Sequence, residues 1–86
     1  MELKTCREQL DRIDDQIIAL FLERMDTVRH VADYKKSHDL PVLAPAREAE
    51  ILSRVREKSG EELAPYAEAL FETIMRVSRE YQNTLL

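Results

Sequence analysis

The sequence has 86 residues, of which 44% are hydrophobic and 35% are charged, and it contains a single glycine. This composition predicts one folded domain, residues 1–86, and excludes a disordered chain. The formal net charge of −4 argues against nucleic acid as a partner, because such partners require a basic surface.

The first predicted element is a long helix. No glycine or proline interrupts the stretch from Leu3 to Ser37, and its apolar residues recur at helical spacing. A helix of this length would span about 50 Å. The apolar stripe consists of Leu3, Leu10, Ile13, Ile17, Leu20, Phe21, Val28 and Val31.

Two shorter helices are expected to follow. Residues 37–44 contain Pro41 and predict a loop, after which Pro45 suits the first position of a second helix that ends near Gly60. Pro65 then suits the first turn of a third helix, which carries an apolar stripe from Tyr66 to Leu85. The predicted fold is all-α, with one long helix and two shorter helices.

The length of the first helix also predicts an assembly. About 50 Å exceeds the diameter of a compact domain of this size, so two shorter helices cannot cover the whole apolar stripe. A second copy of the chain would cover it, and we expect an intertwined homodimer. The helix pattern alone leaves open a coiled-coil-like bundle that carries no chemistry.

Polar residues interrupt the apolar stripes of all three predicted helices. Arg24 falls between Ile17 and Val31 on the stripe of the first helix, where a buried guanidinium needs an anionic partner. For any one such cation, a structural role is the simpler interpretation: a neighbouring carboxylate or contact with water would satisfy it. A polar glutamine at a helix seam is likewise more often a structural amide. The seven interrupting residues are Arg7, Arg24, Lys35, Arg47, Glu48, Ser78 and Gln82.

Taken together, these residues predict a pocket for a small dianion, since four of the seven are cationic and two are neutral hydrogen-bonding groups. Arg24 and Lys35 are separated by about 16 Å along the helix, so their long side chains can reach one ligand. Arg7 lies about 42 Å from Lys35 and can join that pocket only from a second, antiparallel copy of the chain.

The ordered set of residues resembles the all-helical class of chorismate mutases over nearly the whole chain. The resemblance begins with the stretch from Arg7 to Asp14 (Arg-Glu-Gln-Leu-Asp-Arg-Ile-Asp), and it continues with Arg24 and with Lys35 eleven residues later. The remaining pieces are Leu40-Pro41-Val42, the pair Arg47-Glu48, and Ser78 followed four residues later by Gln82.

The resemblance implies rearrangement of chorismate to prephenate in phenylalanine and tyrosine biosynthesis, by an isomerase that needs no metal or other cofactor. It implies that Arg24, and Arg7 of a second copy, bind the two carboxylates of chorismate. Lys35 and Gln82 would donate hydrogen bonds to the ether oxygen, and Glu48 would bind the ring hydroxyl. Two supporting roles follow: Arg47 would add positive potential and Ser78 would assist at the ring carboxylate.

The chain departs from the family pattern at Ala44, where the family commonly has an aspartate that caps the second helix. Loss of that cap costs about 1 kcal/mol, and we expect weaker substrate binding or a looser loop rather than loss of activity. Two alternatives stay open. An isochorismate pyruvate lyase could use the same scaffold, although Glu48 argues against it, and the chain could be a non-catalytic dimerisation or regulatory module.

Location is predicted from three negative features. The single cysteine, Cys6, rules out an internal disulfide and favours a reducing compartment. No apolar run approaches membrane-spanning length, and the N-terminal residues do not resemble a secretion signal. We therefore expect a cytoplasmic protein without membrane contact.

Overall fold

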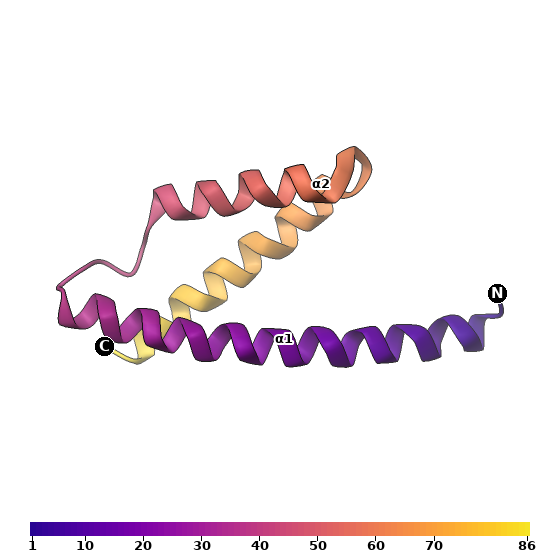
Figure 1. Ribbon diagram of the computed structural model, residues 1–86, viewed down its shortest axis with the longest axis horizontal. Helices are drawn as coiled ribbons and strands as arrows, with labels where there is room; N and C mark the ends of the chain where they lie inside the picture. Colours follow the sequence, from indigo (N-terminus) through magenta and orange to yellow (C-terminus); the bar gives the residue numbers. More distant parts are fainter.

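The protein is all-α, as predicted, and its computed structural model describes residues 1–86. Helix α1 spans Leu3–Ser37 and helix α2 spans Pro45–Thr84, and the chain contains no strand (Figure 1). The bounds of α1 are those expected from the sequence, because no residue in it breaks a helix and Lys35 and Lys36 place positive charge at its carboxyl end.

A short loop connects the two helices. It begins where the Leu40 amide donates a hydrogen bond to the Lys35 carbonyl at 2.8 Å, which closes the last turn of α1. It ends at Pro45, which occupies the first turn of α2 as predicted. Ala44 precedes it and provides no side-chain cap, also as predicted.

The expectation of three helices is wrong in count, because one helix, α2, covers the region assigned to the second and third. Within α2, Gly60 alone leaves helical geometry, with φ 77° and ψ 164°. The chain returns to helical geometry directly after Gly60, and Pro65 lies inside α2. Gly60 nevertheless reverses the chain, so that residues 45–59 (the first arm) and residues 61–84 (the second arm) fold back on each other (Figure 1).

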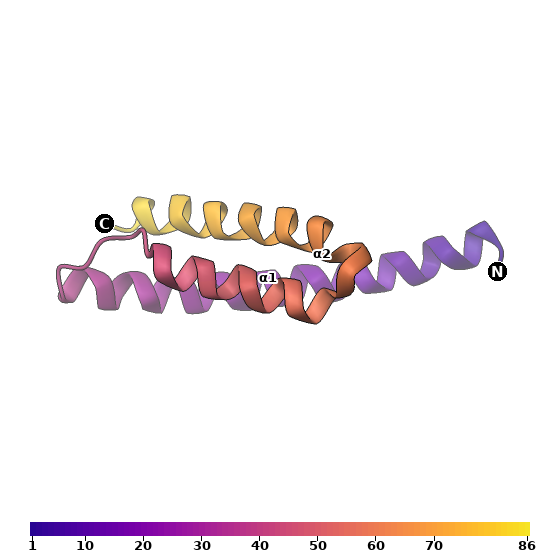
Figure 2. The same ribbon diagram turned by 90° about the horizontal axis from the view of Figure 1, so that it is seen from above.

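The core of the chain lies between these two arms. Ile51 and Val55 of the first arm pack with Met75 of the second arm. Three partly buried apolar side chains extend this cluster: Leu52, Ala67 and Phe71. Near the reversal, an ion pair of 2.7 Å between Arg56 and Glu68 also links the arms. The arms therefore hold each other in place and lie along the carboxyl-terminal half of α1 (Figure 2).

The amino-terminal half of α1 projects beyond the arms (Figures 1 and 2). The chain measures 53 × 26 × 15 Å and has a radius of gyration of 15.9 Å, against about 12 Å for a compact domain of this length. Its accessible surface is 6899 Å², about 30% more than the value expected from its mass. Apolar side chains form much of this excess: Leu3, Leu10, Ile13, Ile17, Ile18, Leu20 and Leu22 are all exposed.

Neither helix contains a segment that is long and apolar enough to cross a membrane.

Candidate functional site

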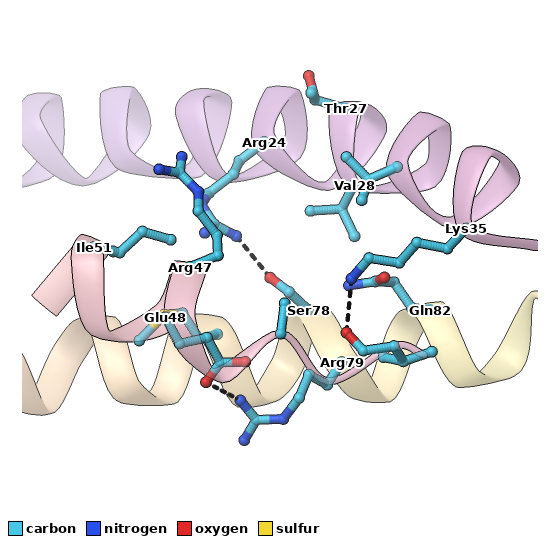
Figure 3. A pocket seen from close by; sticks show the side chains of 14 residues that line it. Arg24, Thr27, Val28, Lys35, Arg47, Glu48, Ile51, Ser78, Arg79 and Gln82 are labelled. Atoms are coloured by element: carbon cyan, nitrogen blue, oxygen red, sulfur yellow. Dashed lines mark hydrogen bonds and ion pairs between the residues drawn. The ribbon is translucent and has the colours of Figure 1, made fainter. Parts of the chain in front are cut away.

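A pocket of about 280 Å³ lies between the carboxyl-terminal half of α1, the connecting loop and both arms of α2 (Figure 3). Seven of the eight residues selected from the sequence line it: Arg24, Lys35, Ala44, Arg47, Glu48, Ser78 and Gln82. They come from segments that are distant in the sequence, so the fold brings together the residues that the resemblance singled out.

Arg24 enters the pocket from α1 and has no carboxylate partner. Its Nη1 donates a hydrogen bond of 2.7 Å to Ser78 Oγ on the second arm. Arg24 therefore does not form the ion pair with a neighbouring helix that was the structural alternative. Burial lowers the pKa of Arg24 from its ordinary value, and the positive charge of Arg47 lowers it further. Both effects disfavour the charged guanidinium until an anion joins it.

Ser78 and Gln82 line the pocket from one face of the second arm because they lie four residues apart on a helix. Both are buried. The Ser78 hydroxyl donates to the Ile74 carbonyl at 2.7 Å, which leaves its oxygen free to accept from Arg24. Gln82 Oε1 is buried without a hydrogen-bond partner, a situation that costs about 1–3 kcal/mol in a folded protein. An amide that is kept at this cost is typical of a ligand site.

Lys35 reaches the pocket from the last turns of α1. Its Nζ donates a hydrogen bond of 2.7 Å to the carbonyl oxygen of Val42 in the loop. This contact fixes the loop over the pocket and holds the ammonium group in the wall. Like Arg24, Lys35 has no carboxylate partner, and its side chain extends toward Gln82 in Figure 3.

The first turn of α2 contributes Arg47 and Glu48, which are held by different partners. Arg47 forms an exposed ion pair of 2.6 Å with Glu50 on the same helix. Glu48 Oε1 accepts a hydrogen bond of 2.5 Å from Arg79 of the second arm. Arg79 is the charged pocket residue that the sequence did not select. Its spacing of three residues from Gln82 was the available signal, but only the packing of the two arms pairs it with Glu48.

Apolar side chains form much of the rest of the pocket lining, and the sequence had placed all of those named next except Met75 on apolar stripes. The lining includes Val28 and Val31 of α1 and Ile51 and Met75 of the arms. These side chains supply a low-polarity surface against which an apolar ring can pack, and they strengthen the field of the cations around it.

Arg7, the eighth selected residue, lies outside the pocket on the projecting half of α1, where it is exposed. This position agrees with the helix geometry, which separates Arg7 from the pocket within one chain. Its expected role requires a second copy of the chain.

The arrangement suits binding of a small dianion with an apolar body. Arg24 and Lys35 are cations without carboxylate partners, Ser78 and Gln82 are neutral hydrogen-bonding groups, and one wall is apolar. The fold and the pocket therefore define an all-helical protein with a cationic, partly enclosed site.

Comparison with known proteins identifies the family. The chorismate mutase type II family matches residues 6–83, so this chain belongs to that family. The match includes all eight residues selected from the sequence. No solved structure gives a significant match.

Three curated relatives illustrate the similarity. The T-protein of Enterobacter agglomerans is 33% identical over 79 residues, which cover 92% of this chain and 21% of that protein. The T-protein of Haemophilus influenzae is 34% identical over 82 residues, which cover 94% of this chain and 22% of that protein. The chorismate mutase of Methanocaldococcus jannaschii is 34% identical over 55 residues, which cover 64% of this chain and 56% of that protein. The chain thus spans about a fifth of the length of the two T-proteins.

Proposed function

We propose that this chain is a chorismate mutase that rearranges chorismate to prephenate. The observation that carries the proposal is the pairing of two cations that lack carboxylate partners, Arg24 and Lys35, with a buried glutamine in one pocket. Chorismate is a dianion with an apolar ring, which matches this lining. Membership of the family and similarity to the Methanocaldococcus jannaschii chorismate mutase support the assignment.

The proposed reaction breaks an ether C–O bond and forms a C–C bond within one molecule. The protein therefore has to select the compact conformer of the substrate and stabilise negative charge that develops on the ether oxygen. Arg24 can bind a carboxylate through two parallel hydrogen bonds, which fixes orientation better than a lysine would. Ser78 supports Arg24 at this position.

Lys35 and Gln82 are the proposed donors to the ether oxygen, and Glu48 is the proposed acceptor for the ring hydroxyl. Lys35 Nζ is held at the pocket by the Val42 carbonyl and has further hydrogens to donate. Arg47 adds positive potential at the mouth of the pocket. Ala44 provides only backbone contacts, so the loop there lacks the carboxylate that is common in the family.

We also propose that the active form is a homodimer in which Arg7 completes the pocket of the other copy. The projecting half of α1 exposes a row of apolar side chains that a second α1 can cover. In an antiparallel pair, placing Arg7 opposite Val28 puts the two-fold axis between Ile17 and Ile18. Both isoleucines are 56% exposed in the single chain. The cytoplasm is the proposed location, since Cys6 is a free thiol.

A direct assay tests the activity. Purified protein is incubated with chorismate and, separately, with isochorismate, and the products are separated by chromatography. We expect prephenate from chorismate, and we expect Lys35→Met to lower kcat/KM on the order of 100- to 1000-fold, because it removes a preorganised donor. Equal turnover by a folded Lys35→Met variant would contradict the assignment of Lys35. Salicylate and pyruvate from isochorismate would favour the lyase instead.

A further inference from the structure

The Glu48–Arg79 ion pair differs from the other ion pairs of the chain. Like Arg56–Glu68 it joins the two arms, here across 31 residues of sequence, but only in this pair do both members line the pocket, and their side chains are only 23% and 31% exposed. By contrast, Arg76 and Glu80 form an exposed pair within one arm. The pair of Glu48 with Arg79 therefore belongs to the pocket wall rather than to the solvated surface (Figure 3).

Glu48 poses an electrostatic problem in a pocket for a dianion. It is the one carboxylate in the lining, and in a partly desolvated pocket it would repel both carboxylates of a bound dianion. The positively charged guanidinium of Arg79 is hydrogen-bonded to Glu48 Oε1 and largely compensates its negative charge. Because the pair is close to neutral, Arg24 and Lys35 remain as the cations that can act on the ligand.

The pair also determines the direction of the Glu48 carboxylate. Arg79 Nη1 holds Oε1, so the second oxygen, Oε2, is left to accept a hydrogen bond. A glutamate side chain without such a partner rotates among several conformers and loses entropy when it binds. An arginine fixed by packing in the second arm removes much of this freedom before the ligand arrives.

We propose that Arg79 is a positioning residue that neutralises Glu48 and orients its free oxygen toward the hydroxyl group of the substrate. This inference rests on the proposed function. In this role Arg79 acts on the substrate through Glu48, to which its Nη1 is bonded, rather than by binding a substrate carboxylate. The chain can therefore keep a hydroxyl-binding carboxylate inside an anion-binding pocket.

A double-mutant cycle tests the proposal. The variants are Arg79→Met, Glu48→Gln and the double variant, and Arg76→Met serves as the matched control because Arg76 pairs with Glu80 on the exposed face of the same arm. For Arg79→Met we expect KM for chorismate to rise on the order of tenfold or more with a smaller change in kcat, since the unpaired carboxylate then repels the ground state and the transition state alike.

The decisive result is the double variant. Removing the charge of Glu48 removes the repulsion, so Glu48→Gln/Arg79→Met should have a lower KM than Arg79→Met alone, and Arg79→Lys should be intermediate. Additive losses would overturn the proposal, because they would mean that Arg79 binds the substrate directly. An unchanged KM in Arg79→Met would overturn it as well. Circular dichroism and urea midpoints of all variants identify any that fail to fold, and the double variant, which has no unpaired charge, remains informative in that case.

Binding of malonate, a small dicarboxylate, measured by calorimetry at low salt, separates this proposal from the proposed function. If wild-type protein does not convert chorismate but the variants show the same order in malonate affinity, the proposed function fails and the role of Arg79 stands. If the wild-type protein is active and the variants do not differ from it, only the role of Arg79 fails. If the wild-type protein neither turns over chorismate nor binds malonate, both fail.

Discussion

Arg24 is held in the pocket by a serine hydroxyl rather than by a carboxylate. Its lowered pKa means that the folded chain binds this proton less tightly than the unfolded chain does. Below the lowered pKa, the charged side chain therefore opposes folding, and stability rises as the pH increases through that value toward the ordinary pKa. Near neutral pH, Arg24 is charged in both the folded and the unfolded chain, so the loss of folding stability caused by burying its charge does not change with pH. The proposed binding role of Arg24 would therefore come at the expense of stability, as it often does for functional residues.

Replacing Arg24 tests this conflict. Arg24→Met keeps much of the side-chain volume and removes the charge, while Ser78 retains its hydrogen bond to Ile74. We expect a gain of up to about 1 kcal/mol in the free energy of unfolding together with a loss of most activity. Urea unfolding at matched protein concentration and the chorismate assay provide the two measurements. A less stable variant would mean that the hydrogen bond to Ser78 outweighs the burial of the charge.

The sequence predicted most of the polar pocket residues and missed Arg79. Arg24, Ser78 and Gln82 could be selected because each interrupts an apolar stripe, and an interruption is visible within one helix. Arg79 interrupts no stripe. Its importance depends on Glu48, which lies in the other arm, and pairing between distant segments is not encoded in the spacing of either one.

At the scale of the elements, Gly60 determines the shape of α2. Its φ of 77° and ψ of 164° fall in a region that side-chain-bearing residues rarely occupy. A Cβ added at Gly60 would meet no atom within 4 Å, so the requirement for glycine comes from the backbone and not from crowding. The position of the break could be predicted from the only glycine in the sequence. The sequence counted a helix on each side of Gly60 as a separate element, whereas the structure continues helical geometry on both sides of this single residue.

Gly60→Ala should therefore destabilise the chain. We expect a loss of about 1–3 kcal/mol in the free energy of unfolding, from strain at this one residue. Lys58→Ala is the control, since Lys58 lies exposed two residues earlier in the first arm. Urea midpoints at equal concentration provide the comparison. If both variants lose the same small amount, the reversal does not depend on glycine.

At the scale of the whole molecule, the structure leaves exposed the apolar stripe from which the dimer was predicted, and the dimer itself stays a prediction. The sequence predicted that two shorter helices cannot cover the first, and the arms leave Leu10 and Ile17 of α1 exposed. The apolar stripe alone did not predict the mode of pairing, because a stripe indicates that a partner is needed but does not specify its direction or register. The antiparallel arrangement follows only from requiring Arg7 to reach a pocket.

Mixing two inactive variants tests the shared pocket. Arg7→Ala and Arg24→Ala should each be nearly inactive, since every pocket in either homodimer lacks one arginine. After denaturation and refolding together, about half of the dimers are mixed, and each mixed dimer has one complete pocket. We expect recovery of about a quarter of the wild-type activity. Refolding each variant alone is the control. Mixed dimers that are detected by mass spectrometry but remain inactive would exclude the contribution of Arg7 from the second copy.

The uncovered half of α1 also has a kinetic consequence. The arms bury Ile51, Val55 and Met75 within one chain, whereas the projecting half of α1 keeps its apolar side chains exposed until, in the proposed dimer, a second copy covers them. If the proposed dimer forms, the last stage of its assembly is bimolecular, so its rate should increase with chain concentration, and extreme dilution should remove both proposed sites at once. The amount of active protein would then depend on how often two chains encounter each other as well as on how many are made.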